Sequence, residues 1–378
     1  MGKKTELEEE AALELPPADE VAPRFVVHPS NNLASPEDHR AAMDALNFGV
    51  AFGDYMAVAR WTPETGWEDR RVVEYGPLPL MPSAAVLHYG QEIFEGIKAY
   101  RWDDGSVWTF RPSFNAARLN HSARRLAMPE LDRDDFLGSV AQTVRADERW
   151  VPDAPDSSLY LRPFMIATEA FLGVRPAREF HYLLISSPVG PYFKGGVKPV
   201  SIWVSTDYHR AAPGGTGDAK TGGNYAASLL PQELAAQKGY DQVCYLDAKS
   251  NQNLEELGGM NLFVVRADGT VQTPALNGSL LEGGTRSAII QLLEDWGITV
   301  EEVTLGLDQL VSDIRAGEVS ELFACGTAAV VTPIGKIANE NFEVDITGGP
   351  LTAEIHDELC GIQRGQVPDR HGWMYRLV

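Results

Sequence analysis

The clearest periodic pattern in the chain predicts a helix over residues 286–296. Apolar side chains recur there at intervals of three and four residues, and Gly297 follows as a stop signal: Ile289, Leu292, Leu293 and Trp296. Helical spacing also predicts helices from Phe114 to Arg125, over about 133–150 and over 225–238. Pro231 lies inside the last of these. Because proline lacks the backbone N–H, we expect a kink there or a regular helix that starts at Pro231.

Short runs of β-branched and aromatic residues predict strands between these helices. The runs are 54–61, 160–166, 182–186, 201–205, 322–325 and 329–331. Residues 102–110 predict a hairpin with Asp104-Gly105 at its turn, and residues 243–274 predict a meander of strands. The mixture of strands and helices favours an α+β fold.

The length of 378 residues predicts two domains. Residues 1–22 are acidic and contain Pro16 and Pro17, and we expect them to form a disordered tail. A Gly- and Pro-rich stretch at 188–199 is the best candidate for an interdomain linker. It would separate a smaller N-terminal domain, 23–187, from a larger C-terminal domain, 200–378.

Charge and cysteine content exclude several classes of protein. The chain has 32 Lys and Arg against 53 Asp and Glu, a net charge of −21, which disfavours nucleic acid and anionic membranes. The three cysteines, Cys244, Cys325 and Cys360, are too widely spaced to indicate a disulfide framework or a zinc site. Glutamates follow Lys3 and Lys4 where a signal peptide needs apolar residues. We therefore expect a cytoplasmic protein that holds no metal.

The most informative stretch is the glycine-rich loop 214–223 around Lys220. It resembles a phosphate-binding P-loop, but Ala219 stands where that motif requires glycine. The alternative is a lysine that forms a Schiff base, because glycines on both sides let a flat ring approach the backbone. A surface lysine in a flexible loop is as good an interpretation of this stretch alone.

Several motifs in a fixed order decide between these interpretations. From about Phe48 to the C-terminus the chain resembles the branched-chain amino acid aminotransferases, most of all the actinobacterial members. These are two-domain enzymes of fold type IV that depend on pyridoxal phosphate. The resemblance rests on residues 87–89, 94–100, 110–112, 115–119, 159–163, 219–225, 256–261 and 325–329.

This resemblance implies a set of cofactor contacts. Lys220 would carry pyridoxal phosphate, Tyr225 would lie at its phenolic oxygen and Glu256 at its pyridine nitrogen. Arg118 would pair with the phosphate, since a guanidinium binds phosphate oxygens in a bidentate manner. Further phosphate contacts are expected from Gly284, Thr285 and Thr327. Without the family, Arg118 would be a helix-surface arginine, Glu256 a solvated turn carboxylate, and Thr285 only the N-cap of the following helix.

The resemblance also implies substrate contacts. Arg162 would receive the side-chain carboxylate of glutamate, and aromatic walls would accept Leu, Ile or Val. Those expected at the substrate are Phe52, Tyr89, Arg162, Tyr192, Gly259 and the backbone of Ala328. The aromatic residues among them are otherwise explained by core packing. The chain departs from the common family pattern at Tyr55 and Gly284, and it lacks the redox C-x-x-C, with Ala329 and Thr332 at those positions.

The predicted reaction is a reversible ping-pong transfer of an amino group between L-Leu, L-Ile or L-Val and 2-oxoglutarate, with glutamate and 2-oxo acids as the other partners. The family implies a homodimer with its active site between two domains. Two alternatives keep the same fold: a D-amino acid aminotransferase and an aminodeoxychorismate lyase. A P-loop nucleotide-binding protein is an alternative of another class.

Overall fold

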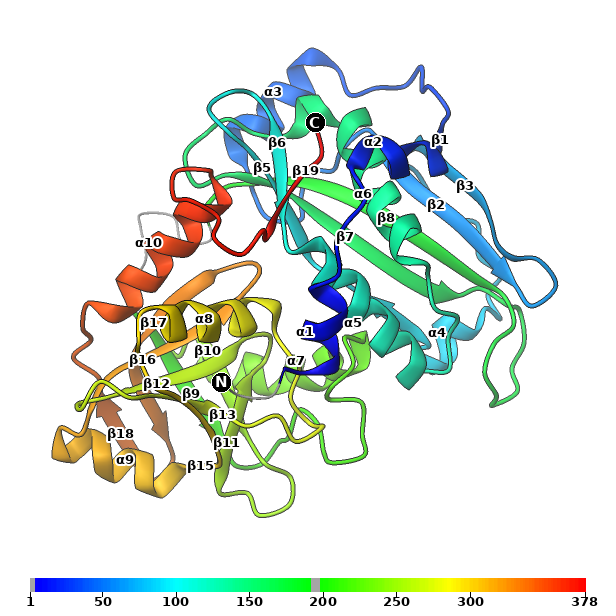
Figure 1. The fold of residues 1–378 in the computed structure, drawn as a ribbon. Helices are drawn as coiled ribbons and strands as arrows, with labels where there is room; N and C mark the ends of the chain where they lie inside the picture. The colour runs from blue at the N-terminus through cyan, green and yellow to red at the C-terminus, as the bar shows by residue number, and fades with distance from the viewer. Residues whose placement is uncertain (1–3, 192–197) are drawn as a thin grey trace. The chain divides into compact units, whose positions relative to one another are not determined.

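The computed structural model describes residues 4–191 and 198–378. Contacts divide the chain into two compact units (Figure 1). Unit 1 comprises Met1–Tyr192 and Gly361–Val378, and unit 2 comprises Phe193–Cys360. None of the helices within the described ranges is long and apolar enough to cross a membrane.

Unit 1 is built on a nine-stranded sheet with the order β1-β3-β2-β8-β7-β5-β6-β19, in which β4 also pairs with β7. Its strands are β1 (Val26–Val27), β2 (Tyr55–Thr62), β3 (Gly66–Glu74), β4 (Glu92–Phe94), β5 (Ile97–Arg101), β6 (Val107–Phe110), β7 (Ser158–Ala167), β8 (Phe180–Val189) and β19 (Met374–Arg376). The expected hairpin is present as β5 and β6, which pair in antiparallel fashion. Gly105 in its turn has φ = 86°, a conformation that glycine adopts without strain.

The helices of unit 1 pack against its sheet and contribute to the same hydrophobic core. They are α1 (Glu6–Ala11), α2 (Ala18–Val21), α3 (Pro36–Ala45), α4 (Ala85–Tyr89), α5 (Pro112–Arg125) and α6 (Arg133–Ala146), with short 3-10 turns at Ala22–Arg24 and Glu148–Trp150. Helix α6 packs on β2 and β8. Phe136, Leu137 and Val140 on this helix are fully buried in the same cluster as Leu159 and Leu161 of β7.

Unit 2 is built on a ten-stranded sheet with the order β14-β13-β12-β16-β17-β9-β10-β11-β15, in which β18 also pairs with β17. Its strands are β9 (Val200–Ser205), β10 (Gln242–Leu246), β11 (Asn253–Leu257), β12 (Asn261–Arg266), β13 (Val271–Pro274), β14 (Val300–Val303), β15 (Leu305–Gly306), β16 (Val319–Gly326), β17 (Val330–Asn339) and β18 (Phe342–Asp345). The predicted meander over 243–274 corresponds to β10–β13.

The helices of unit 2 include the one that carries Pro231. They are α7 (Gly222–Gln237), α8 (Gly284–Asp295), α9 (Leu307–Ala316) and most of α10 (Leu351–Gln363), which crosses into unit 1. Helix α7 begins at Gly222 rather than at Pro231, so the proline is accommodated within a continuous helix. Helix α9 was not predicted, although Leu307, Leu310 and Val311 are spaced for one buried face.

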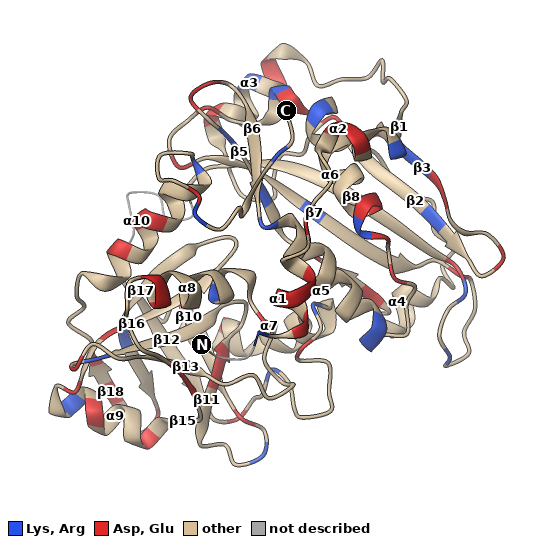
Figure 2. Ribbon diagram, in the orientation of Figure 1, with Lys and Arg blue, Asp and Glu red and all other residues tan. Residues whose placement is uncertain are grey.

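The expectation of a disordered tail was wrong for residues 4–22, the part of that segment that the structure describes. Thr5 and Glu8 form a reciprocal capping box that starts α1. Leu7 is buried with Phe114 and Ala117 of α5, so tertiary contacts order a segment whose composition predicted disorder. Figure 2 shows acidic residues, drawn red, along α1, and it shows Lys and Arg interspersed with Asp and Glu in both units.

The expected boundaries differ from the structure in three further respects. Strand β8 extends to Val189, into the segment 188–199 expected to be a linker, and residues 192–197 of that segment lie outside the described residues. Residues 361–378 belong to unit 1 rather than to the C-terminal domain, because β19 pairs with the edge strand β6, Met374 opposite Phe110. Unit 1 is therefore the larger unit, where the smaller was expected.

Candidate functional site

Lys220 lies in the loop before α7 and contacts the first aromatic residue of that helix. Its Nζ donates a hydrogen bond to Tyr225 Oη at 2.7 Å. Asn224 holds the loop, since its Nδ2 donates to Thr216 O at 2.7 Å and to Ala219 O at 2.9 Å. Burial alone would raise the pKa of the Tyr225 phenol, but the charge and hydrogen bond of Lys220 lower it below its ordinary value. The lysine is thus fixed beside a polarised phenol rather than exposed on a flexible loop.

Glu256 is a buried carboxylate on β11, only 3% exposed, and not a solvated turn residue. Its Oε1 accepts from Arg210 Nη1 at 2.7 Å and from the backbone N of Leu281 at 3.0 Å. Burial raises the pKa of Glu256 to about 7, and the positive charge of Arg210 opposes that rise. The carboxylate therefore depends on nearby positive charge to stay ionised at neutral pH.

Arg210 is a functional candidate that the motifs did not reveal. It is 5% exposed, and besides Glu256 its Nη1 donates to Gly217 O at 3.3 Å. It therefore links the carboxylate on β11 to the loop that carries Lys220. A side chain at Gly217 is excluded, because a Cβ there would lie 2.1 Å from Ser279 O. No local pattern in the sequence connects Arg210 to Glu256.

Strand register brings the other predicted residues of unit 2 to the same end of the sheet. Glu256 on β11 pairs with Asn261 on β12, which pairs with Cys325 on β16. Thr327 and Ala328 lie in the turn that directly follows β16 and leads into β17. Gly259 lies in the turn from β11 to β12, next to Tyr225. A Cβ at this position would lie 3.7 Å from the Tyr225 ring.

The start of α8 is held by the same residues. Asn261 Nδ2 donates to Leu281 O at 3.0 Å, and the N of Leu281 donates to Glu256. The helix begins at Gly284 with Gly283 as its N-cap, so the expectation that Thr285 is the N-cap was wrong; Thr285 lies inside the first turn. A Cβ at Gly283 would lie 2.1 Å from Asn261 Oδ1, which explains the glycine. Backbone N–H groups at such a helix start favour an anion.

Arg118 in unit 1 is buried and bidentate, and is not a helix-surface arginine. Its Nε and Nη2 donate to the two oxygens of Glu95 at 2.7 and 2.8 Å. Asn115 Nδ2 donates to the same carboxylate at 2.7 Å. Helix α5 supplies Arg118 and Asn115, and Glu95 lies between β4 and β5. The guanidinium is thereby held in one orientation.

Arg162 on β7 lies among aromatic side chains. Its Nη2 donates to Tyr160 Oη at 3.0 Å, and its guanidinium carbon lies 4.6 Å from the centre of the Phe94 ring. The Phe48 ring packs edge-on against Tyr160, with the ring centres 4.9 Å apart. We call Phe48, Phe94, Tyr160 and Arg162 the Arg162 cluster. A cation beside aromatic faces can receive both a carboxylate and an apolar group.

The structure does not bring every predicted substrate residue into this cluster. Phe52 stacks instead on Tyr75, with ring centres 5.1 Å apart. Tyr89, at the end of α4, donates its hydroxyl to Leu172 O. Tyr192 lies outside the described residues. Phe94, which belongs to the motif at 94–100, could have been predicted; Phe48 carried no local signal.

The fold, the residues around Lys220 and Glu256 in unit 2, and the Arg162 cluster in unit 1 together define a class of protein. The chain belongs to the class IV aminotransferases, whose family model matches residues 92–337. The chain is 52% identical to the branched-chain-amino-acid aminotransferase of Mycolicibacterium smegmatis, over 93% of this chain and 98% of that protein. It is 51% identical to that of Mycobacterium tuberculosis, over 94% and 98%. The solved Escherichia coli branched-chain amino acid aminotransferase matches with a TM-score of 0.72, 29% identity and coverage of 86% and 100%. The expected family and the two-domain α+β fold of type IV are thus confirmed.

Proposed function

We propose that this protein is a branched-chain amino acid aminotransferase that depends on pyridoxal phosphate. It would transfer amino groups reversibly between L-Leu, L-Ile or L-Val and 2-oxoglutarate. The observation that carries the proposal is the cluster of Lys220, Tyr225, Glu256 and Arg210 in unit 2. Relatives with this named activity that match nearly the whole chain at about half of its positions support it.

The residues present fit pyridoxal phosphate, because they offer an amine, a phenol, a buried carboxylate and an anion-binding helix start in one unit. When bound, the cofactor takes up the amino group and draws electrons away from the substrate Cα. Lys220 would hold it covalently, and Tyr225 would donate to its phenolic oxygen. Glu256 would keep its pyridine nitrogen protonated. Gly284, Thr285, Thr327 and Arg118 would bind its phosphate.

Lys220 would then move the proton that the reaction requires. A neutral Nζ would take the proton from the substrate Cα as a base, and the charged Nζ would give it up again as an acid. The hydrogen bond of 2.7 Å from Lys220 Nζ to Tyr225 Oη would hold the amine in one orientation.

The Arg162 cluster would select the substrate side chain. Arg162 would bind the distal carboxylate of glutamate, and Phe48, Phe94 and Tyr160 would enclose the apolar side chain of a branched-chain donor. In unit 2, Gly259 and the backbone of Ala328 would bind near the α-carboxylate. Tyr89 is proposed as a substrate contact on the family resemblance. Phe52 and Tyr192 remain proposals from the family resemblance alone.

Steady-state kinetics test the function directly. We expect parallel double-reciprocal lines for L-leucine and 2-oxoglutarate, because the first product leaves before the second substrate binds. The purified protein should also show a visible absorption band that shifts on addition of L-leucine. Intersecting lines would contradict the proposed order of steps. A band that shifts with D-alanine alone would indicate a D-amino acid aminotransferase instead.

We also propose a homodimer in the cytoplasm. An exposed apolar group on unit 1 supports the dimer: Met81, Leu87, Tyr89, Leu172 and Val174, of which Val174 is 90% exposed. The main chain joins its two segments, since Phe171 N donates to Ser83 O at 2.9 Å and Ala85 N donates to Glu169 O at 2.9 Å. The three cysteines form no disulfide, which supports a reducing compartment.

Light scattering after gel filtration checks the oligomer. We expect a mass of twice the 41.4 kDa chain, and we expect Val174→Asp to shift the protein toward monomer because it buries a charge in the apolar group. Val26→Asp is the matched control, since Val26 is 60% exposed outside this group. A fully active monomer would contradict the homodimer.

A further inference from the structure

The turn that carries Phe48 is hydrogen-bonded at both of its ends to residues at the end of β8. Residues 46–54 lead from α3 to β2, and residues 47–50 are exposed. Gly190 N donates to Leu46 O at 3.0 Å, and Ser187 Oγ donates to Ala51 O at 2.6 Å. Such a turn contributes little to the core, so its position depends on these ties.

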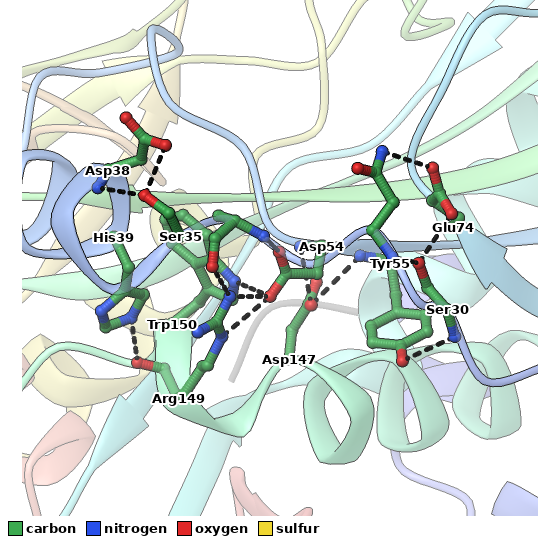
Figure 3. Close-up of polar contacts among 12 residues, drawn as sticks. Ser30, Ser35, Asp38, His39, Asp54, Tyr55, Glu74, Asp147, Arg149 and Trp150 are labelled. Atoms are coloured by element: carbon green, nitrogen blue, oxygen red, sulfur yellow. Dashed lines mark hydrogen bonds and ion pairs between the residues drawn. The ribbon is translucent and has the colours of Figure 1, made fainter.

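Asp147, just after α6, holds the chain on the C-terminal side of this turn, next to the hydrogen bond between Ser187 and Ala51. Its Oδ1 accepts from the backbone N of Asp54 at 2.9 Å and of Tyr55 at 3.1 Å, and its Oδ2 accepts from Ser186 Oγ at 2.7 Å. Figure 3 shows this carboxylate at the entry to β2. A Cβ at Gly53 would lie 2.1 Å from Asp147 Oδ2, so only glycine lets the chain pass this close.

The neighbouring carboxylate, Asp54, ties a third segment to the same place. It accepts from Ala34 N at 2.7 Å, Trp150 Nε1 at 2.7 Å and Arg149 Nε at 2.9 Å (Figure 3). These hydrogen bonds outweigh burial and lower the pKa of Asp54. Asp147, in contrast, is fully buried and accepts from two backbone N–H groups and a serine hydroxyl, which are uncharged, and burial raises its pKa to about 7. Its geometry therefore requires an acceptor at this position more than a negative charge.

We propose that Asp147 is a positioning residue of the substrate site: it holds the Phe48 turn so that Phe48 packs on Tyr160 of the Arg162 cluster. This inference rests on the proposed function, because it takes that cluster as the substrate contact. Asp147 itself touches neither substrate nor cofactor. It acts through the backbone of residues 53–55 and through Ser186.

Three variants test this role. Asp147→Leu removes the acceptor, and we expect KM for L-leucine and for L-glutamate to rise about tenfold while kcat changes less than about twofold. Asp147→Asn keeps an acceptor for both backbone N–H groups and should restore KM to within about twofold of the parent enzyme. Asp135→Leu is the matched control: it removes a buried carboxylate of α6, paired with Arg24 and Arg70, far along the helix from residue 147.

A readout without cofactor or turnover accompanies the kinetics. Hydrogen–deuterium exchange of the cofactor-free protein should be faster over 46–55 in Asp147→Leu and unchanged there in Asp135→Leu. If Asp147→Leu does not fold, Ser186→Ala removes only the bond to Oδ2 and should raise both KM values in the same direction, by about threefold.

Phe48→Ala separates the two levels of the proposal. If it raises KM but Asp147→Leu leaves KM and exchange unchanged, or does no more than Asp135→Leu, the positioning role is overturned and the proposed function stands. If Phe48→Ala leaves KM unchanged for both donors, Phe48 is not a substrate contact. The role of Asp147 in the reaction then falls with that assignment, whatever exchange shows.

Discussion

Replacement of Lys220 with alanine should abolish transamination and remove the visible absorption of the purified protein. The reason is that, in the proposed function, Nζ would hold the cofactor and move the substrate proton beside Tyr225 Oη, to which it donates a hydrogen bond. We expect kcat to fall by at least about 10³-fold. Stopped enzyme assays with L-leucine and 2-oxoglutarate, together with an absorbance spectrum, measure both effects.

Lys238→Ala is the control for this variant. Lys238 lies just after α7, pairs with Glu340 at 2.5 Å and sits over the Trp203 ring. Its loss should leave both activity and absorption intact. A Lys220→Ala protein that still turned over at an appreciable rate would refute the assignment of the reactive lysine, and the glycine-rich loop would need another explanation.

Replacement of Arg210 with methionine should move the acid limb of the activity profile to higher pH. Arg210 is the strongest of the charges that oppose the rise in the pKa of Glu256, which burial brings to about 7. Without it the carboxylate takes up a proton at a higher pH, and in the proposed function only the ionised carboxylate would support a protonated pyridine nitrogen. We expect kcat at pH 7 to fall about 10²-fold, measured across pH 6–9.

The same variant changes the pH dependence of stability. The pKa of Glu256 is above its ordinary value, so the native state binds this proton more tightly than the unfolded state. Its contribution to stability is therefore present at low pH and is lost as the pH rises through about 7. Loss of one partner from a buried ion pair costs about 3–5 kcal/mol while the other stays charged. We expect the cofactor-free Arg210→Met protein to unfold at a lower temperature at pH 8 than at pH 6.

Arg266→Met controls for loss of an arginine from unit 2. Arg266 pairs with Asp313 at 2.5 Å, a pair that involves neither Glu256 nor the Lys220 loop. It should change stability modestly and leave the acid limb in place. An unmoved acid limb in Arg210→Met would show that Arg210 does not set the ionisation of Glu256.

The site residues differ in how far they could be predicted. Lys220 and Tyr225 lie five positions apart at the start of one helix, so a short motif is enough to place them together. Arg210 and Glu256 meet only because a loop and a strand distant in the chain fold together, and neither had a local signal for the other. Phe48 and Phe52 show the same limit: both are aromatic and close in sequence, but one packs on Tyr160 and the other on Tyr75.

The N-terminal segment is the clearest case in which tertiary contacts order residues whose composition predicts disorder. Its glutamates and prolines are typical of disorder, and composition alone offers no reason for it to fold. Leu7 finds an apolar site on α5, formed by Phe114 and Ala117, and that contact offsets the entropy of ordering the segment. A surface that another part of the chain creates cannot be recognised from the segment itself.

The sequence by itself determined the strands and helices whose periodicity matched their burial, the α+β class, the family, and the glycine-rich loop around Lys220 as the candidate site. These depend on local spacing and on short motifs, which are properties of neighbouring residues. Only the tertiary structure decided that residues 361–378 complete the sheet of unit 1. It alone also decided that Glu256 is buried and paired with Arg210. It also decided that the carboxylate of Asp147 accepts hydrogen bonds from the backbone N of Asp54 and of Tyr55. Burial, pKa and contacts between distant segments arise only when the chain has folded, because each depends on which surfaces exclude water together.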